Sequence, residues 1–360
     1  MTPHFLDALR ERVLIGDGAM GTQLYARGVF LNRAFEELNL TEADLVVGVH
    51  QAYLRSGAEI IETNTFGANR FKLASFGLAE KVHAVNLAGA RIARHAARDT
   101  AWVAGSIGPL GVRVEPWGKT GLDEAEAIFA EQAQGLVEGG VDLFVLETFR
   151  DVNEIGAAIR AIRAVSRVPV VAMLTTAEDG NTLDGTPVEQ FGPQLIEFGA
   201  DVLGVNCSVG PAAMLDTVER LAKAVPGALL AAMPNAGKPR DVDGRNLYLC
   251  SPDYMASYAR RFVAAGVRLI GGCCGTTPEH VKQISASVRA LAAPVHHAAS
   301  TTGPAQPTRE AIVPVAVESK SRLANALRRG RFVTGIELTP PPGVVQDIVA
   351  QQAREARING

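Results

Sequence analysis

Residues 143–173, LFVLETFRDVNEIGAAIRAIRAVSRVPVVAM, contain the repeating unit that decides the fold of this chain. The unit begins with a short apolar run at residues 143–146. It continues through residues 152–166, where apolar side chains recur at helical spacing, and ends in a second apolar run at residues 168–173. This order is typical of two parallel strands joined by a crossover helix. The stretch therefore predicts one β–α–β unit.

The same alternation extends from this unit in both directions along the chain. Eight short apolar runs recur, at residues 12–16, 58–62, 101–105, 143–146, 168–173, 202–205, 228–233 and 267–271. Stretches with helical spacing lie between and after them, at residues 43–56, 79–97, 122–139, 152–166, 187–198, 212–224, 252–265 and 279–291. Eight strands alternating with eight helices predict an α/β fold of the (β/α)₈ TIM-barrel class.

The overall composition excludes several classes of protein. The chain has 360 residues, of which 47% are hydrophobic and 20% are charged, and its formal net charge is -3. This balance, without a basic stripe, argues against binding to nucleic acid or to a membrane surface. The N-terminus lacks the pattern of a secretory signal, and no apolar run approaches transmembrane length. Four cysteines in 360 residues are too few for a disulfide framework, so we expect a cytoplasmic protein, with an oligomer possible.

The sequence changes character after residue 292, where small residues, proline, serine and threonine replace the periodic pattern. We expect a barrel domain at residues 1–292 and a linker at residues 293–320. Residues 321–329 then predict a helix and residues 332–338 a strand. These elements are too few to form a domain, so residues 321–360 are expected to be the truncated start of a second α/β barrel domain.

Polar residues follow almost every predicted strand. They are Asp17, Glu62-Thr63-Asn64-Thr65, Ser106, Glu147-Thr148, Thr175-Thr176, Asn206-Cys207-Ser208, Asn235 and Cys273-Cys274. The opposite ends of the strands carry ordinary turn sequences. Because barrel active sites are built at the carboxyl ends of the strands, we expect these polar residues to share one rim.

Three cysteines of this rim, Cys207, Cys273 and Cys274, suggest a metal site. Thiolates bind zinc well, and three protein ligands leave the fourth position for a substrate thiol. Adjacent residues of a strand point to opposite faces, so we expect the glycines at 271, 272 and 275 to bend the backbone. Two alternatives are three buried apolar cysteines and a disulfide between Cys273 and Cys274. The fourth cysteine, Cys250, is expected to be structural.

A second group of rim residues suits an amino acid. Asp17 lies in a glycine-rich turn, where main-chain amides near Gly18 can bind a carboxylate. Asp17 and Glu147 can receive an ammonium group. The alternatives are a turn or helix cap for Asp17, and an ion pair of Glu147 with Arg150 or Arg70.

Six motifs give the chain a family resemblance. They are DGAMGT (17–22), ETNTFGA (62–68), GSIGP (105–109), LETF (146–149), GVNCS (204–208) and GGCCGTTPEH (271–280). Together they resemble the zinc- and homocysteine-binding domain of homocysteine S-methyltransferases over residues 10–292. The resemblance implies a (β/α)₈ barrel with zinc on Cys207, Cys273 and Cys274. It also implies the homocysteine amino group on Asp17 and Glu147, its carboxylate on the amides around Gly18 and Ala19, and an oxygen from Asn235 for zinc.

The end of the chain carries a second, shorter resemblance. Residues 333–342, VTGIELTPPP, are similar to the opening of a methylenetetrahydrofolate reductase, with Glu337 at its acidic position. This similarity implies a fusion that couples production of methyl-folate to methionine synthesis. FAD is expected only for the missing reductase part, whose flavin and folate sites would lie beyond Gly360, and we expect no reductase activity from these residues.

The first resemblance implies that homocysteine thiolate attacks an activated methyl group and forms methionine. The small methyl donor remains open among S-methylmethionine, S-adenosylmethionine, betaine, methylcobalamin and methyl-folate. Residues 110–121 are the expected lid, with Trp117 either covering the donor or simply exposed. A zinc hydrolase and a regulatory or zinc-buffering module for the attached reductase are the competing functions.

Overall fold

The computed structural model describes residues 4–30, 32–242, 245–292, 321–331 and 333. The chain divides into two units, Met1–Val295 and His296–Gly360. In the second unit the described part is essentially one helix, α14 (Arg322–Arg328), which Ser321 caps by accepting a hydrogen bond from the amide of Ala324. The predicted helix at 321–329 is thus confirmed, whereas the predicted linker and the strand at 332–338 lie outside the described residues.

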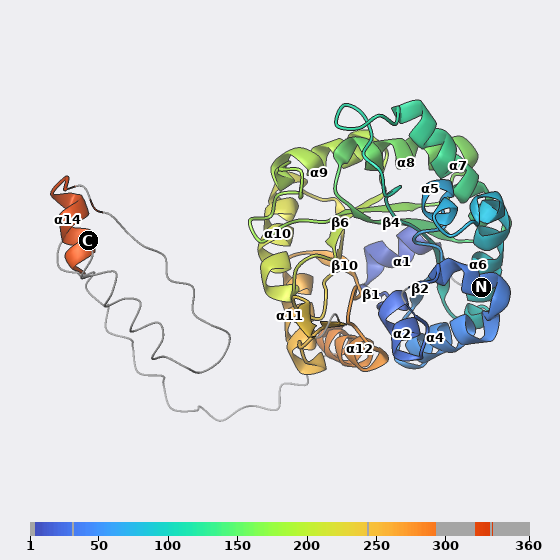
Figure 1. Cartoon of the computed structure of the whole chain (residues 1–360). Helices are drawn as coiled ribbons and strands as arrows, with labels where there is room; N and C mark the ends of the chain where they lie inside the picture. Colours follow the sequence, from blue (N-terminus) through green and yellow to red (C-terminus); the bar gives the residue numbers. More distant parts are fainter. Residues whose placement is uncertain (1–3, 31, 243–244, 293–320, 332, 334–360) are drawn as a thin grey trace, which may run out of the picture. The chain divides into compact units, whose positions relative to one another are not determined.

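The first unit is built on eight parallel strands, each of which matches a predicted apolar run (Figure 1). They are β1 (Leu14–Ile15), β2 (Ile60–Glu62), β3 (Trp102–Ile107), β4 (Leu143–Phe149), β5 (Val170–Leu174), β6 (Val202–Asn206), β7 (Leu229–Met233) and β10 (Val267–Ile270). Their order in the sheet is β1-β10-β7-β6-β5-β4-β3-β2. The amide of Glu59 donates to the carbonyl of Ile15 at 2.8 Å and joins the first strand to the second. The predicted eight-stranded barrel is therefore confirmed.

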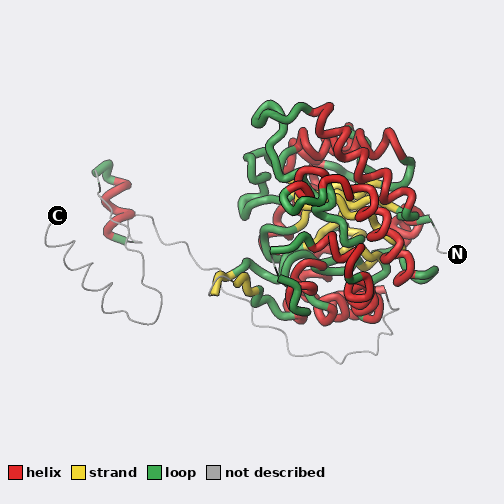
Figure 2. Tube along the Cα trace, turned by 45° about the vertical axis from the view of Figure 1, so that its right-hand side comes forward, coloured by secondary structure: helices red, strands yellow, loops and turns green. Residues whose placement is uncertain are grey.

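Helices surround the barrel, and all eight predicted ones are present (Figures 1 and 2). They are α4 (Ala43–Arg55), α6 (Val82–Ala97), α7 (Leu122–Glu138), α8 (Val152–Val165), α9 (Val188–Glu197), α10 (Pro211–Ala224), α11 (Pro252–Ala264) and α12 (Pro278–Ala292). Helix α8 shows why they form: Asp151 caps its first turn, and Ile155, Ile159 and Ile162 bury one face at helical spacing.

Two layers of apolar side chains hold the barrel together. Alternate strand residues, such as Val145, Val171 and Met173, fill its interior, and their neighbours pack outward against the helices. Helix α1 (Phe5–Glu11) adds Phe5 to the interior layer, where its ring meets Trp102 edge-on at a centroid distance of 6.2 Å. This packing closes the amino end of the barrel and leaves the carboxyl end for the site.

Several short elements were absent from the sequence-based expectations. Helix α2 (Met20–Ala26), η1 (Phe35–Glu37), α3 (Leu38–Thr41) and α5 (Arg70–Ala74) precede the main helices, and a hairpin of β8 (Arg240–Val242) and β9 (Arg245–Leu247) follows β7. The short helix η2 (Ala79–Lys81), in contrast, opens the helical stretch predicted at residues 79–97. In Figure 2 the loops and this hairpin gather on one face of the barrel. Within the described residues, no helix is long and apolar enough to cross a membrane.

Candidate active site and metal centre

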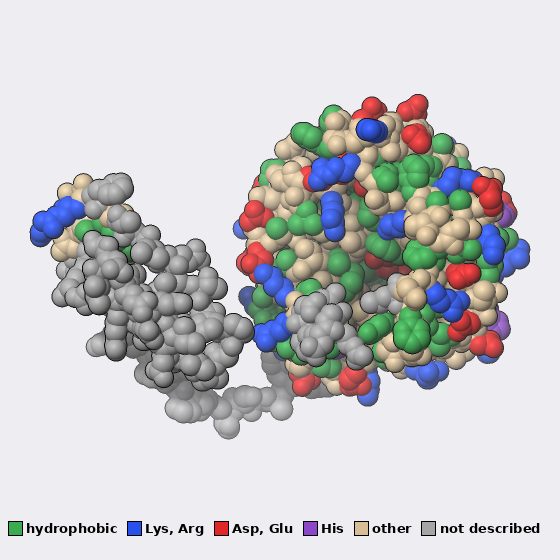
Figure 3. Space-filling model, viewed as in Figure 1, with side chains coloured by type: hydrophobic (Ala, Val, Ile, Leu, Met, Phe, Trp, Pro, Cys, Tyr) green, Lys and Arg blue, Asp and Glu red, His purple; other side chains and the backbone are tan. Residues whose placement is uncertain are grey.

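A cavity of about 940 Å³ opens at the carboxyl end of the strands. Figure 3 shows it as a hollow in this face of the molecule, with acidic side chains at its floor. Its lining includes most of the rim predicted from the sequence: Asp17, Glu62, Thr63, Asn64, Thr65, Ser106, Glu147, Thr148, Cys207, Cys273 and Cys274. The parallel strands therefore bring together side chains that lie more than 250 residues apart in sequence.

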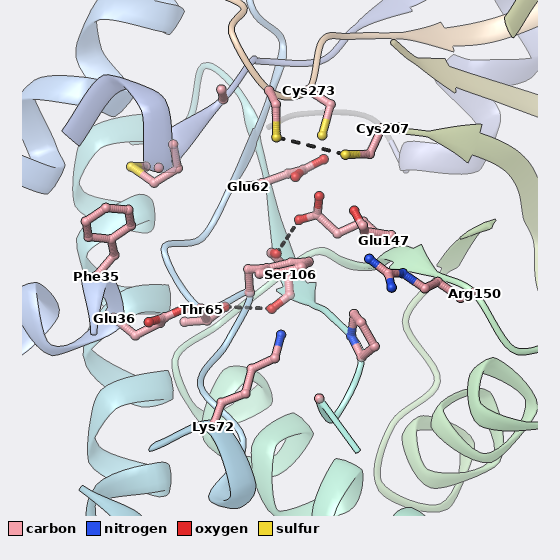
Figure 4. A pocket seen from close by; sticks show the side chains of 18 of the residues that line it. Phe35, Glu36, Glu62, Thr65, Lys72, Ser106, Glu147, Arg150, Cys207 and Cys273 are labelled. Atoms are coloured by element: carbon pink, nitrogen blue, oxygen red, sulfur yellow. Dashed lines mark hydrogen bonds between the residues drawn. The ribbon is translucent and has the colours of Figure 1, made fainter. Parts of the chain in front are cut away.

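The sulfur atoms of Cys207, Cys273 and Cys274 form one cluster at the inner end of the cavity. All three lie within 4.8 Å of one another, and the Sγ atoms of Cys207 and Cys274 are 3.9 Å apart (Figure 4). All four cysteines are free, so the alternative of a disulfide between Cys273 and Cys274 is wrong for this structure. Sulfur atoms about 4 Å apart match the edges of a tetrahedron around zinc, whose bonds to sulfur are about 2.3 Å long.

The backbone at Cys207 turns its side chain into this cluster. Cys207 and Ser208 have φ angles of 59° and 62°, in the left-handed region that non-glycine residues seldom adopt. The turn is held by hydrogen bonds from the amide of Cys207 to the carbonyl of Met233 and from the amide of Val209 to the carbonyl of Cys207. Such local strain persists only where the surrounding structure fixes it, and it is typical of functional sites.

The glycines around Cys273 and Cys274 have two different roles. Only Gly275 has a positive φ, at 78°. Gly271 and Gly272 are instead required by close packing, because a Cβ atom would lie 2.9 Å from the carbonyl oxygen of Asp17 and 2.5 Å from Thr276 Cγ2, respectively. The left-handed conformation that glycine allows is therefore used at Gly275, whereas Gly271 and Gly272 are needed for close packing.

Neighbouring groups make the sulfur cluster ready to hold a cation. Hydrogen bonds from the other two thiols lower the pKa of Cys207, and their hydrogen bonds to Cys207 are the main cause of the raised pKa values of Cys273 and Cys274. The Nδ2 atom of Asn206 lies 3.8 Å from Cys273 Sγ, and Tyr248 forms a hydrogen bond with Cys274. A bound divalent cation would displace the thiol protons and supply the positive charge that balances the three thiolates.

Asn235 lies beside the sulfur cluster. Its side chain forms a hydrogen bond that lowers the pKa of Cys207, and the residue is only 2% exposed. Its Oδ1 atom is buried without a hydrogen-bond partner among the described residues. An unpaired buried oxygen on a residue that contacts Cys207 fits a metal ion at the sulfurs, because a buried acceptor left unpaired costs about 1–3 kcal/mol.

Three carboxyl groups lie next to the sulfurs, on Asp17, Glu62 and Glu147. The amide of Glu62 donates to Asp17 Oδ2 at 3.0 Å, which links the ends of the first two strands. The hydroxyl of Ser106 donates to Glu147 Oε1 at 2.5 Å, and Asn206 Nδ2 lies 3.5 Å from Glu147 Oε2. Figure 4 shows the carboxyl of Glu62 between the sulfurs and Glu147.

Burial raises the pKa of each of these three carboxyl groups. The charge of Glu147 raises the pKa of both Asp17 and Glu62 further. The structure shows no ion pair between the three groups and a described lysine or arginine side chain, although the charge of Lys72 lowers the pKa of Glu147. The cluster is therefore short of positive charge, which suits a cationic ligand.

The turn at Gly18 and Ala19 borders the carboxyl groups. The amide of Ala19 donates to Thr276 Oγ1 at 3.1 Å, and the hydroxyl of Tyr53 donates to the carbonyl of Ala19 at 2.8 Å. A Cβ atom on Gly18 would lie 2.6 Å from Thr276 Oγ1, so glycine is required there by packing. A carboxylate binding at this turn would compete with Thr276 for the amide of Ala19.

The outer part of the cavity has a different character. Lys72 Nζ lies 4.3 Å from the ring centroid of Phe66 and points toward Glu147 in Figure 4. From the predicted lid, Gly111, Val112 and Arg113 line this part. Trp117, in contrast, is 67% exposed and lines a separate hollow of about 240 Å³. The structure therefore shows Trp117 as an exposed aromatic residue that does not line the main cavity.

Two alternatives for the acidic residues are not supported. Arg70, considered as a partner of Glu147, is paired with Glu131 and Glu80 instead. Asp17 accepts a hydrogen bond from the strand amide of Glu62 and caps no helix, because α2 begins with Ala19 as its N-cap residue.

Sequence reasoning missed side chains that complete the site. Glu62, Ser106 and Asn206 were placed on the rim without a role, and Tyr248 and Lys72 were not considered. The sequence pointed to Glu62, Ser106 and Asn206 only through their positions at the ends of predicted strands. Tyr248 follows the hairpin that the sequence did not predict, so no pattern pointed to it.

Comparison with known proteins agrees with this geometry. A family model described as homocysteine S-methyltransferase matches residues 14–288. Methionine synthase from Mycobacterium tuberculosis is 35% identical over 309 residues, which cover 80% of this chain and 26% of that protein. Methionine synthase from Mycobacterium leprae is 34% identical over 303 residues, which cover 79% and 25%. The chain thus spans about a quarter of the length of these curated relatives.

Solved structures give the same result. The metallated form of the homocysteine methyltransferase MmuM from Escherichia coli superposes with a TM-score of 0.68 at 26% identity, covering 79% of this chain and 99% of that one. Its oxidised form gives a TM-score of 0.67 at 28% identity, covering 79% and 98%. Since the family model matches well over half of the chain, the chain belongs to the homocysteine S-methyltransferase family.

Proposed function

We propose that the barrel transfers a methyl group to the thiol of L-homocysteine and so forms methionine. The observation that carries this proposal is the position of the sulfur cluster beside an acidic pocket, within one cavity. A thiol and an ammonium group on the same small molecule match these two features. The family to which the chain belongs supports this choice of acceptor.

Cys207, Cys273 and Cys274 would hold zinc, with the Oδ1 atom of Asn235 as a further ligand before substrate enters. The mutual distances of the sulfurs and the unpaired buried oxygen support this assignment. When bound there, zinc lowers the pKa of an incoming thiol and keeps its sulfur as a nucleophilic thiolate.

The residues of the chain would bind and orient the acceptor. Asp17 and Glu147 accept hydrogen bonds from the ammonium group, and the amides at Gly18 and Ala19 bind the carboxylate in competition with Thr276. Ser106 and Asn206 hold Glu147 in place through the hydrogen bonds described above. Holding the thiol in a fixed direction lets it attack a methyl carbon in line from the open part of the cavity.

Hydrolysis is the less favoured chemistry for this site. Three thiolate ligands outweigh the positive charge of zinc and so weaken its ability to ionise water. The described residues include no histidine in the lining of the cavity. A zinc-buffering or regulatory module remains the competing function, and it differs from the proposal in needing no acceptor pocket.

The proposal extends to the remainder of the chain. We place the barrel at residues 1–292, a linker at residues 293–320 and the start of a reductase-like domain at residues 321–360. The motif at residues 333–342 supports this fusion, which would couple methyl-folate production to methionine synthesis. The methyl donor would be a small molecule that enters by the side of Lys72 and Arg113.

The test combines zinc content with methyl transfer. We expect about one zinc per chain by mass spectrometry and loss of homocysteine thiol when a suitable donor from the five named classes is added. Cys273→Ser should abolish both zinc retention and transfer, whereas Cys250→Ser, which alters a free thiol outside the cluster, should preserve them. Zinc retention without homocysteine binding would favour the buffering function, and transfer by Cys273→Ser would refute the proposed mechanism.

A further inference from the structure

Glu62 lines the cavity, and the proposed function gives its carboxyl group no role. It ends β2, where its backbone pairs with Ala104 of β3, so the strand fixes where its side chain begins. The side chain lines the cavity between the sulfurs and Glu147 (Figure 4). It is therefore within the space that an acceptor amino acid would fill.

The Oε1 atom of Glu62 is unpaired. This atom is buried and has no hydrogen-bond partner among the described residues, although a hydrogen bond between the Glu62 and Glu147 carboxyl groups contributes to the raised pKa of Glu62. The neighbouring carboxyl groups differ, because Asp17 Oδ2 already accepts from the Glu62 amide and Glu147 Oε1 already accepts from Ser106. A buried carboxylate oxygen without a donor is costly, which points to a ligand that supplies one.

The chemistry of the missing donor follows from the charges around it. Asp17, Glu62 and Glu147 form an acidic cluster without a paired lysine or arginine among the described residues. Among described histidine, cysteine and acidic side chains, only the three cysteines are grouped closely enough to hold a metal ion. An organic cation with several N–H donors is thus the better match, and an ammonium group has three.

We propose that Glu62 is the third carboxyl acceptor for the ammonium group of the acceptor substrate, and that this three-carboxyl pocket selects α-amino thiols over thiol acids. The inference rests on the proposed function, since it assumes that homocysteine occupies the cavity. Asp17 and Glu147 receive two of the three N–H donors, and the unpaired Oε1 of Glu62 receives the third.

Binding measurements on the zinc-loaded full chain test this without a methyl donor. The two ligands are L-homocysteine and 4-sulfanylbutanoate, which has the same thiol and carboxylate but no amino group. Glu62→Gln should weaken homocysteine binding by about 10-fold or more, as for loss of a charge-assisted hydrogen bond, and change 4-sulfanylbutanoate binding by less than about 2-fold. Isothermal titration calorimetry measures both affinities.

The matched control is Glu59→Gln, which alters a carboxylate three residues earlier that pairs with Arg12. It should leave the ratio of the two affinities at the wild-type value. Glu62→Asp keeps the charge but shortens the side chain, so its ratio of the two affinities should lie between those of the wild type and Glu62→Gln. This variant takes the place of Glu62→Gln if Glu62→Gln folds poorly. Zinc content and melting temperature are measured for every variant.

Two results would overturn the inference. Unchanged affinities for both ligands in a folded, zinc-replete Glu62→Gln would show that Glu62 does not contact the ammonium group. An equal loss for both ligands would assign Glu62 a structural role. If wild-type protein binds neither ligand, the proposed function fails together with this inference, whereas normal wild-type binding with an unaffected variant rejects the inference alone.

Discussion

Replacement of Asn206 by alanine should damage both the stability of the barrel and its acceptor site. Asn206 ends β6 and is buried beside Glu147 and Cys273. Its Oδ1 atom accepts a hydrogen bond from the amide of Thr148 at 2.7 Å, and its Nδ2 atom donates to Thr148 Oγ1 at 2.9 Å. These bonds hold Thr148 at a φ angle of 63°, directly after Glu147.

The expected loss follows from these contacts. Asn206→Ala leaves the Thr148 amide without its acceptor, which costs about 1–3 kcal/mol for a buried donor. Loss of the second bond adds about 1 kcal/mol, so the total is about 2–4 kcal/mol. With an unfolding entropy of about 2.1 cal/mol/K per residue, a barrel of about 290 residues loses about 1.6 °C per kcal/mol, so the melting temperature should fall by about 3–7 °C.

The assay pairs thermal unfolding with homocysteine binding, and the control is Asn39→Ala. Asn39 is also buried and donates to the backbone carbonyls of Asn64 and Val85, away from the sulfurs. Both variants should lose stability, but only Asn206→Ala should also lose homocysteine affinity, because Glu147 and its neighbour Thr148 are no longer held. An Asn206→Ala protein with wild-type stability and affinity would refute this reasoning.

Three further predictions concern other parts of the barrel. Burial lowers the pKa of His50 to about 4 from an ordinary value of 6.5, so its contribution to stability is complete above pH 6.5 and is lost as the pH falls toward 4. Between pH 7 and pH 5 the free energy of unfolding of His50→Leu should therefore fall by about 2 kcal/mol less than that of the wild type. Urea unfolding midpoints at the two pH values measure this, and an equal shift of the midpoint in both proteins would contradict it. Gly275→Ala places a Cβ atom 2.1 Å from Tyr248 Cγ at a positive φ, so its melting temperature and zinc retention should fall, and a variant matching wild type in both would count against the packing described here. Chelation of zinc should lower the melting temperature and make all three clustered cysteines reactive to thiol reagents, with Cys250 reacting equally in both states.

The repeating pattern of the sequence predicted most of the fold, because each strand and each helix buries apolar residues at the spacing that is characteristic of that element. Ile155, Ile159 and Ile162 reveal their helix directly, and every apolar run became a strand. The hairpin β8–β9 was missed because its two three-residue strands carry no alternation long enough to detect. The short helices after the strands were missed for the same reason.

The site was only partly predictable. Strand ends identified the rim, since parallel strands of a barrel place their carboxyl ends on one face. The left-handed backbone at Cys207 was not readable, because cysteine and serine seldom adopt it and only the packed structure imposes it. The importance of Glu62 also depended on the structure, because an unpaired oxygen has no signature in sequence.

The central claim is that the cysteine cluster binds a metal ion that accepts the thiol of homocysteine as a fourth sulfur ligand. Cobalt(II) substituted for zinc reports this directly, because its sulfur-to-metal charge-transfer absorption grows with the number of thiolate ligands. We predict tetrahedral cobalt with three thiolates in the free protein, and about one third more charge-transfer intensity after addition of L-homocysteine. Unchanged absorption at saturating homocysteine, or cobalt binding that survives Cys207→Ser with its full thiolate intensity, would contradict the claim.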